Sequence, residues 1–413
     1  MIALLFLLAS TACSQDDNVT KTEPDLVARA RGIHERVITL DTHNDISTAN
    51  FTADRNYTMA LSTQVNLPNM EAGGLDVSWM VVFVGQGDLT PERYGDAHRQ
   101  ALAKFEAVHR LTEQIAPDRI ELALTSDDVR RIIAAGKKVA MIGVENAYPI
   151  GTDLSNIELF HEMGARYMSL AHNGHNDISD SANPNPALGD TESEHGGISA
   201  FGEEVIAEMN RVGIMVDVSH ISKQAMLEAA RHSQAPVIAS HSSVKALCNV
   251  SRNMDDEQLL ALRENGGVIQ TVALADFVKL DPRRDSAIES LREKFDLPRG
   301  PMTPQRLERM SERERADFFQ KRTAFDSQMT DIDETFPPAN VSDFVDHIDY
   351  AVSLIGIDHV GIGTDIDMRG EDYIEIWRYL TQGLLDRGYS REDIEKILGE
   401  SFLRVFRANS PSE

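Results

Sequence analysis

Cysteine is almost absent from this chain, which has only Cys13 and Cys248 among its 413 residues. Because Cys13 lies in an amino-terminal segment with the features of a processed signal, the folded part keeps one thiol and forms no internal disulfide. The fold must then be held together by its hydrophobic core. Cys248 itself is expected to be a small buried hydrophobic residue.

Basic side chains are also few, since 40 Lys and Arg stand against 66 Asp and Glu and give a formal charge of -26. Such a charge repels nucleic-acid phosphates and anionic lipid headgroups, which argues against nucleic-acid binding and against polybasic membrane binding. Hydrophobic residues make up 42% of the chain and charged residues 26%. These shares are those of a soluble globular protein and exclude collagen-like, disordered and multi-span membrane classes.

A long hydrophobic run is missing at the amino terminus. Residues 2–9 are apolar, but this run is far shorter than the roughly 20 residues that span a bilayer. Followed by small residues and Cys13, it is typical of a secretory signal and resembles a bacterial lipoprotein signal. We therefore expect a signal peptide over 1–13, a polar linker over 14–30, and a periplasmic or cell-envelope protein with a lipid anchor on Cys13. A buried terminal strand or helix is the alternative for this segment.

Eight short apolar segments with turn signals recur along the chain and predict strands. They span residues 37–42, 77–84, 139–144, 167–171, 213–218, 236–240, 267–272 and 359–364. Helical patterns lie between them, with capping boxes at 125–128 and 390–393. Strands this apolar on both faces belong in a buried parallel sheet, and eight alternating with helices favour an α/β fold of the closed (β/α)8 TIM-barrel type. No glycine fingerprint follows the first strand, which argues against a Rossmann domain.

The barrel domain is expected from residue 31 to residue 408, with a short tail over 409–413. One stretch departs from the alternation of strand and helix, because residues 279–338 are strongly charged and interrupted by prolines. We interpret it as a helical insertion after the seventh strand. It is expected to be a lid, a dimer contact or a solvent-exposed excursion.

Polar side chains follow six of the predicted strands at their carboxyl ends. They are His43, Asp45, Glu145, His172, His220, His241 and Asp365. In a (β/α)8 barrel these ends form the mouth where active sites are built, so the seven groups would surround one cavity. Imidazoles and carboxylates are ligands that Zn²⁺ prefers, and burying so many without a cation would be costly. The sequence therefore predicts a metal site.

The spacing of these residues is sufficient for two metal ions. His43 and Asp45 are separated by one residue, so on an extended strand both side chains point the same way and can hold one ion. His220 and His241 are enough for a second ion, and Glu145 can bridge both with its two oxygens. Such a centre polarises a carbonyl and lowers the pKa of a bridging water, which supplies a hydroxide nucleophile. The predicted chemistry is hydrolysis.

Six segments, taken in their order and spacing, resemble the membrane dipeptidase (renal dipeptidase) family of zinc metallopeptidases. They are His43-Asn44-Asp45, Gly143-Val144-Glu145-Asn146, Val216-Asp217-Val218-Ser219-His220, Ser240-His241-Ser242-Ser243, Ser251-Arg252-Asn253 and His359-Val360-Gly361-Ile362-Gly363-Thr364-Asp365. The resemblance runs from about residue 31 to residue 407. It implies two zinc ions, one held by His43 and Asp45 and the other by His220 and His241, with Glu145 bridging.

The resemblance also implies roles for three residues at the mouth. His172 matches the histidine that contacts the substrate and stabilises the tetrahedral intermediate, and Arg252 matches the arginine that pairs with the dipeptide carboxylate. Asp365 matches the carboxylate beside the metals, which either accepts a proton from the nucleophilic water or binds the substrate amine. After Asp365 the family usually continues with Phe-Asp-Gly, whereas this chain reads Ile366-Asp367-Met368-Arg369-Gly370. This departure alters the expected pocket wall and, with it, the expected substrate preference.

We therefore expect a zinc-dependent dipeptidase that hydrolyses free dipeptides, including those with a C-terminal D residue. The resemblance leads us to expect a homodimer. The alternative is a related binuclear amidohydrolase that acts on N-acyl amino acids or lactones. A catalytically silent binding barrel would require a lost ligand, whereas all five expected ligands are present. His175, in the loop after the fourth strand, is not needed to complete the set.

Overall fold

The computed structural model describes residues 23–61, 65–298, 307, 309–365 and 370–410. The expected signal peptide over 1–13, its Cys13 anchor and residues 366–369 lie outside these residues. Within the described part of the chain, no helix is both long enough and apolar enough to cross a bilayer.

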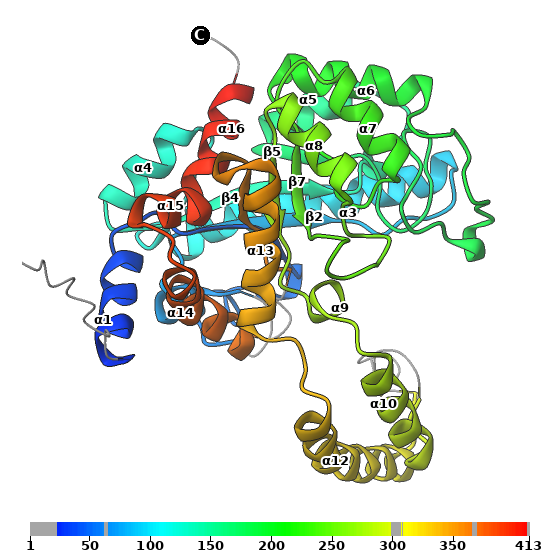
Figure 1. The fold of residues 1–413 in the computed structure, drawn as a ribbon. Helices are drawn as coiled ribbons and strands as arrows, with labels where there is room; N and C mark the ends of the chain where they lie inside the picture. Colours follow the sequence, from blue (N-terminus) through cyan, green and yellow to red (C-terminus); the bar gives the residue numbers. More distant parts are fainter. Residues whose placement is uncertain (1–22, 62–64, 299–306, 308, 366–369, 411–413) are drawn as a thin grey trace, which may run out of the picture.

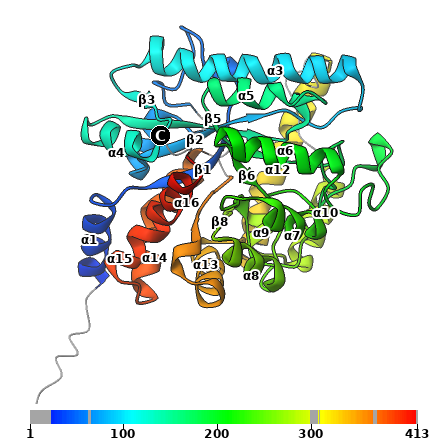
Figure 2. The ribbon, with the colours of Figure 1, turned by 90° about the horizontal axis from the view of Figure 1, so that it is seen from above.

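Eight parallel strands curl into a nearly closed barrel with helices around it (Figures 1 and 2). In order around the sheet they are β1 (Leu40–Asp45), β2 (Val77–Phe83), β4 (Lys138–Glu145), β5 (Ala165–Ser169), β6 (Met215–Asp217), β7 (Ile238–Ser242), β8 (Val268–Thr271) and β9 (Val360–Ile362). Thr42 ties β1 across the barrel, since its hydroxyl donates to the Ser240 carbonyl at 2.6 Å and to the Ile362 carbonyl at 3.3 Å. The predicted (β/α)8 TIM barrel is confirmed.

Two details of the strands differ from the prediction. The first strand begins at Leu40 rather than at residue 37, so His43 and Asp45 lie in the last part of β1 and not after it. An additional short strand, β3 (Ile120–Leu122), pairs with the beginning of β4. With three residues it is too short for hydrophobic periodicity to reveal.

Two helices begin at the capping boxes that the sequence predicts. Thr125 and Asp128 form a capping box at the start of α4, and Ser390 and Asp393 form one at the start of α15. The helices are α1 (Glu23–His34), α2 (Leu67–Gly73), α3 (Pro91–Arg110), α4 (Ser126–Ala134), α5 (Ser155–Glu162), α6 (Ala200–Val212), α7 (Lys223–His232), α8 (Asp256–Asn265), α9 (Ala275–Val278), α10 (Pro282–Lys294), α12 (Glu312–Thr335), α13 (Val341–Ile355), α14 (Gly370–Asp386), α15 (Arg391–Glu395) and α16 (Ser401–Asn409).

The hydrophobic core has two parts because alternate residues of each strand face the barrel interior and the helices. Trp79 and Tyr167 fill the interior with stacked rings whose centroids are 4.9 Å apart, and Phe402 of α16 packs edge-on against Trp79. Residues such as Val82 and Ile142 face outward and join the larger core under the helices. The predicted site residues lie at the carboxyl ends of the strands, beyond this core.

The segment after β8 contains the predicted helical insertion. Helices α10 and α12 form a hairpin that stands away from the barrel (Figure 1). The hairpin holds itself together: Arg284 pairs with Asp333 at 2.7 Å, and the Lys294 ammonium donates to the Gln328 side chain at 2.7 Å. This segment follows the seventh strand of the barrel ring and so leaves from the end that carries the site.

Candidate metal centre

Glu145, the last residue of β4, lies at the centre of a buried cluster of histidines. Its Oε1 atom is 2.9 Å from His220 Nε2, 3.5 Å from His241 Nε2 and 3.6 Å from His172 Nε2. Its Oε2 atom is 3.6 Å from His43 Nε2. Four imidazoles from β1, β7 and the segments after β5 and β6 therefore surround one carboxylate, as the order of the strands predicts.

The ligand atoms of this cluster form two overlapping triplets. One consists of His43, Glu145 and His241, and the other of Glu145, His172 and His220; within each, the atoms lie within 4.8 Å of one another. Both triplets contain Glu145. A carboxylate shared by two sets of nitrogen ligands is able to bridge two metal ions.

Several buried polar atoms of the cluster have no partner of their own among the described residues. Asp45 Oδ1 and His220 Nδ1 make no hydrogen bond. The Nε2 atoms of His220 and His241 are 2.8 Å apart. If neither of these two nitrogens carries a proton, their lone pairs face each other and repel. Because unsatisfied buried polar groups are costly, this set of donors fits a bound cation.

The buried carboxylates of the cluster favour a positive charge beside Glu145. Burial alone would raise the pKa of Glu145, yet the charge of His43 and the contacts with His220 and His241 hold it well below its usual range. Burial alone would lower the pKa of His43, yet Glu145, Asp365 and Asp45 raise it to about 10. The proton on His43 thus offsets the negative charge of these carboxylates, as a bound metal cation would.

The other two carboxylates of the site ionise less readily than usual. Burial, followed by the charge of Glu145, raises the pKa of Asp45 to about 6. Burial also raises the pKa of Asp365 to about 7, while the charge of His43 opposes this shift. Asp365 Oδ1 lies 4.0 Å from His43 Nε2, and its side chain is partly exposed at the mouth.

Three of the four non-glycine residues described with positive φ lie at the site. Asn146 has φ 74°, His220 has φ 70° and Asp365 has φ 55°. Each follows a barrel strand, and each such conformation costs on the order of 1 kcal/mol or more. The strained backbone turns the chain sharply as soon as the strand ends and keeps Glu145, His220 and Asp365 at the mouth.

Arg252 and His172 complete the set of predicted residues. The guanidinium of Arg252 is buried, donates from Nη2 to the His241 carbonyl at 3.2 Å, and leaves Nε without a partner among the described residues. Burial lowers the pKa of Arg252 only to about 10, so the side chain remains a cation at neutral pH. Burial also lowers the pKa of His172. The His172 ring packs on the Phe83 ring, with the two ring centroids 4.6 Å apart.

The structure brings all seven mouth residues and Arg252 to the same end of the barrel. Asp45 is in neither triplet, although its charge acts on His43 and Asp365. His175 has a structural role, because its Nδ1 atom accepts from the Ser181 amide at 2.9 Å and its Nε2 atom lies 3.1 Å from the Thr191 carbonyl. The sequence interpretation omitted Asp41 and Asp217, two buried carboxylates behind the ligands; their place in otherwise apolar strands is the signal that could have revealed them.

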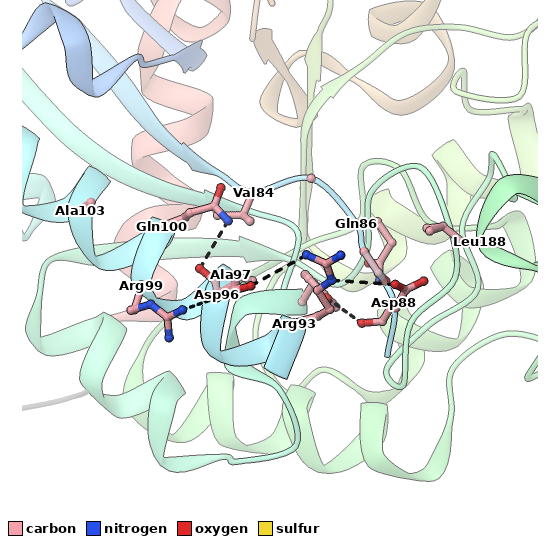
Figure 3. A pocket seen from close by; sticks show the side chains of 13 residues that line it. Val84, Gln86, Asp88, Arg93, Asp96, Ala97, Arg99, Gln100, Ala103 and Leu188 are labelled. Atoms are coloured by element: carbon pink, nitrogen blue, oxygen red, sulfur yellow. Dashed lines mark hydrogen bonds and ion pairs between the residues drawn. The ribbon is translucent and has the colours of Figure 1, made fainter. Parts of the chain in front are cut away.

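An open cavity of about 740 Å³ lies between the first half of α3 and the segment after β2 (Figure 3). Its charged side chains are already paired with one another: Arg93 lies 3.9 Å from both Asp88 and Asp96, and Arg99 pairs with Asp96. None of the predicted site residues lines this cavity. The lining of this cavity and the candidate metal centre therefore share no residue.

Comparison with known proteins gives a consistent picture. Residues 27–412 match the model of the membrane dipeptidase family, peptidase family M19. The chain is similar to dipeptidase aclJ of Aspergillus oryzae, with 30% identity over 88% of this chain and 73% of the relative. It is also similar to dipeptidase tcpJ of Claviceps purpurea, with 29% identity over 85% of this chain and 70% of the relative.

Two solved structures share this architecture. The probable dipeptidase PvdM from Pseudomonas aeruginosa has a TM-score of 0.78 and 28% identity, over 94% of this chain and 99% of the other. A metallopeptidase from Rhodobacter sphaeroides, solved with a phosphinate mimic of L-Ala-D-Ala, has a TM-score of 0.66 and 21% identity, over 90% and 99%. The second likeness concerns the fold alone.

Proposed function

Because the chain belongs to the membrane dipeptidase family and is a metallo-dipeptidase, we propose that it hydrolyses free dipeptides with two zinc ions at the Glu145 cluster. The observation that supports this most directly is the position of Glu145, whose two oxygens lie within 3.6 Å of four histidine nitrogens. A mixture of imidazole and carboxylate ligands is one that Zn²⁺ binds well, and the family resemblance implies zinc.

We assign the ligands as the family resemblance implies. His43 and Asp45 would hold one ion, His220 and His241 the other, and Glu145 both. The closest triplets join His43 with His241 and His172 with His220, so the division between the two ions rests on the resemblance. When bound, the two ions would polarise the peptide carbonyl and lower the pKa of a water molecule so that hydroxide is available near neutral pH.

The protein's own residues supply binding and orientation. Arg252 presents a planar guanidinium beside the cluster and would hold the substrate carboxylate in a two-pronged hydrogen bond. The His172 Nε2 atom lies 3.6 Å from Glu145 Oε1 and, as the family resemblance implies, would donate a hydrogen bond to the oxygen that gains negative charge during hydrolysis. Asp365, partly exposed at the mouth, would take up a proton or hold the substrate amine.

This arrangement favours short substrates. A binding site that recognises an amine at one end and a carboxylate at the other rejects a longer peptide, whose carboxylate falls at the wrong distance. We also propose that a D residue is accepted at the C-terminal position, which the family resemblance implies. The departure from the family pattern at residues 366–370 leaves the preferred side chains open to measurement.

A substrate panel tests the proposal. The purified protein is loaded with zinc and amino-acid release is measured from L,L and L,D dipeptides, matching tripeptides and N-acetylated dipeptides. Cleavage of dipeptides alone, abolished by a chelator and restored by zinc, is the expected result. Cleavage of N-acetylated compounds but not of free dipeptides would instead favour the amidohydrolase alternative. If no substrate of the panel is cleaved, the hydrolase proposal is overturned.

We further propose that the protein is exported, anchored through a lipid on Cys13 and homodimeric. The apolar run at 2–9 before Cys13 supports the first two statements, and the family resemblance supports the third. Fractionation of cells that express the full chain or Cys13→Ser tests the anchor, because the variant should leave the membrane fraction. Sedimentation analysis of the purified protein tests the dimer.

A further inference from the structure

Two buried aspartates behind the ligands form the same set of hydrogen bonds. Asp41 Oδ1 accepts from the backbone amides of His43 at 3.2 Å and Thr364 at 2.9 Å, and its Oδ2 accepts from the Thr364 hydroxyl at 2.6 Å. Asp217 Oδ1 accepts from the amides of Ser219 at 3.0 Å and Ser240 at 2.9 Å, and its Oδ2 accepts from the Ser240 hydroxyl at 2.5 Å. We call these the Asp41 clamp and the Asp217 clamp.

Each clamp joins two neighbouring strands just before a site residue. The Asp41 clamp links β1 to Thr364, which precedes Asp365. The Asp217 clamp links β6 to Ser240, which precedes His241. Both carboxylates are fully buried, so each requires several donors to offset the loss of water. The shared function of the clamps is to fix the position of two strand ends at the mouth.

The Asp217 clamp has one contact that the other lacks. The Ser240 hydroxyl lies 2.9 Å from His241 Nδ1. A serine hydroxyl has a single proton to donate, and the carboxylate of Asp217 is an acceptor only. With the Ser240 proton directed to Asp217, the Ser240 oxygen is left as an acceptor, and His241 must donate to it from Nδ1.

We propose that Asp217 is a positioning residue that acts through Ser240 to keep the proton of His241 on Nδ1, which leaves His241 Nε2 free to bind a metal ion. The inference rests on the proposed function, because it takes His241 as a metal ligand. Hydrogen bonds from a ligand's second nitrogen commonly fix the tautomer and orientation of metal-binding histidines. Here the His241 imidazole donates to the Ser240 hydroxyl, and the hydroxyl donates to the Asp217 carboxylate.

Among the residues that the structure describes, Ser240 is the hydrogen-bond partner of His241 Nδ1. Its Nε2 atom faces Glu145 and His220, both of which belong to the metal cluster. His220 itself has no partner at Nδ1 among the described residues. His43 is held differently, since its Nδ1 atom lies 3.4 Å from the Tyr167 hydroxyl, which donates to the Thr42 carbonyl at 2.9 Å.

Asp217→Asn reverses the direction of this chain of hydrogen bonds. The amide oxygen of the new side chain still accepts from the two backbone amides, which leaves its NH₂ group facing the Ser240 oxygen. Ser240 then accepts from that NH₂ and donates to His241 Nδ1, which moves the His241 proton to Nε2. Ser240→Ala removes the link instead and leaves both tautomers accessible.

The experiment compares histidine tautomers in the full chain, freed of metal and labelled with ¹⁵N at histidine. Long-range ¹H–¹⁵N correlation spectra distinguish a proton on Nδ1 from one on Nε2, and the His241 signals are identified by their absence in His241→Asn. We expect Nδ1 protonation in the unaltered protein, Nε2 protonation in Asp217→Asn and a mixture in Ser240→Ala. Asp41→Asn is the matched control, because Thr364 bonds to Asp41 and to no imidazole nitrogen of the described residues, so the His241 tautomer should not change.

Zinc affinity, measured by competition with a chromophoric chelator, is the second readout. Asp217→Asn should weaken binding by about 10–100-fold, the usual effect of removing a group that orients a ligand. If Asp217→Asn does not fold, Ser240→Ala carries the same comparison with a smaller loss. A wild-type protein that binds zinc but carries the His241 proton on Nε2, or tautomers unchanged in both variants, would overturn this inference. A wild-type protein with the expected tautomer that binds no zinc would overturn the proposed function and, with it, the metal-binding purpose assigned to Asp217.

Discussion

The Nε2 atoms of His220 and His241 lie 2.8 Å apart, and both face the Oε1 atom of Glu145 at 2.9 and 3.5 Å. The two rings come from neighbouring strands of the barrel, so the fold itself imposes their approach. Two neutral imidazoles gain at most one hydrogen bond from such a contact, whereas a cation between them satisfies both nitrogens and the carboxylate. The pair is therefore the geometric core of the candidate metal centre.

Replacing Glu145 removes the carboxylate that both triplets share. We expect Glu145→Gln to lower zinc content and to reduce kcat/KM for dipeptides by at least about 100-fold, since even groups that only orient a ligand contribute 10–100-fold. Metal analysis after dialysis and steady-state kinetics check this. Glu158→Gln is the control, because Glu158 pairs with Arg211 at the exposed surface and its loss should leave both quantities unchanged. Full zinc content in Glu145→Gln would contradict the bridging role.

Arg252 should recognise the carboxylate of the substrate. Arg252→Met is expected to lower kcat/KM for dipeptides by about 100-fold or more, because losing one partner of a buried charge pair costs about 2–5 kcal/mol. Dipeptide C-terminal amides lack that carboxylate and provide a control within the same enzyme. Their slow hydrolysis should be nearly the same in the unaltered protein and the variant. An equal loss on dipeptides and amides would show that Arg252 supports the structure and does not bind the carboxylate.

The metal-free protein should lose stability as the pH rises above neutrality. The folded-state pKa of His43 is raised to about 10 by Glu145 and its neighbours, above the value of about 6.5 in an unfolded chain. The stabilisation from the His43 proton is therefore fully present below pH 6.5 and is lost as the pH passes through about 10. Denaturant midpoints measured with a chelator at pH 7 to 10 should fall.

Two comparisons isolate this effect of pH. His43→Asn has no proton to lose, so its midpoint should change less than that of the unaltered protein over the same range. Saturating zinc should also flatten the curve, because metal takes the place of the proton beside Glu145. A midpoint that falls equally in the unaltered protein and in His43→Asn would assign the pH dependence to another group.

Gly143 makes room for a ring that supports His43. A Cβ atom at Gly143 would overlap the ring of Tyr167, whose hydroxyl bonds the Thr42 carbonyl and lies beside His43 Nδ1. We expect Gly143→Ala to destabilise the protein by about 1–3 kcal/mol through overpacking and to weaken metal binding. Gly95→Ala in α3 is the matched control: its new Cβ would meet only the end of the Arg99 side chain at 3.5 Å, so it should stabilise by about 0.5–1 kcal/mol. Thermal and denaturant unfolding distinguish the two.

Much of the fold was predictable because its signals are local. Each barrel strand is a short apolar segment with polar residues at its carboxyl end, and the capping boxes at Thr125 and Ser390 form as the sequence predicts. β3 escaped prediction because a three-residue strand has no period to detect. β1 begins at Leu40, three residues after the predicted start, although the Thr39 carbonyl already accepts from the Val77 amide at 2.9 Å.

The sequence by itself determined which chemical groups are available and that they meet at one end of a barrel, because strand alternation and the His43-x-Asp45 spacing are properties of adjacent residues. Only the tertiary structure decided how those groups are held. Asp41 and Thr364 are 323 residues apart in the chain, and Asp217 of β6 bonds to Ser240 of the neighbouring strand β7. Such contacts depend on which strands become neighbours when the sheet closes, and no local pattern encodes the distance or direction of a hydrogen bond formed in that way.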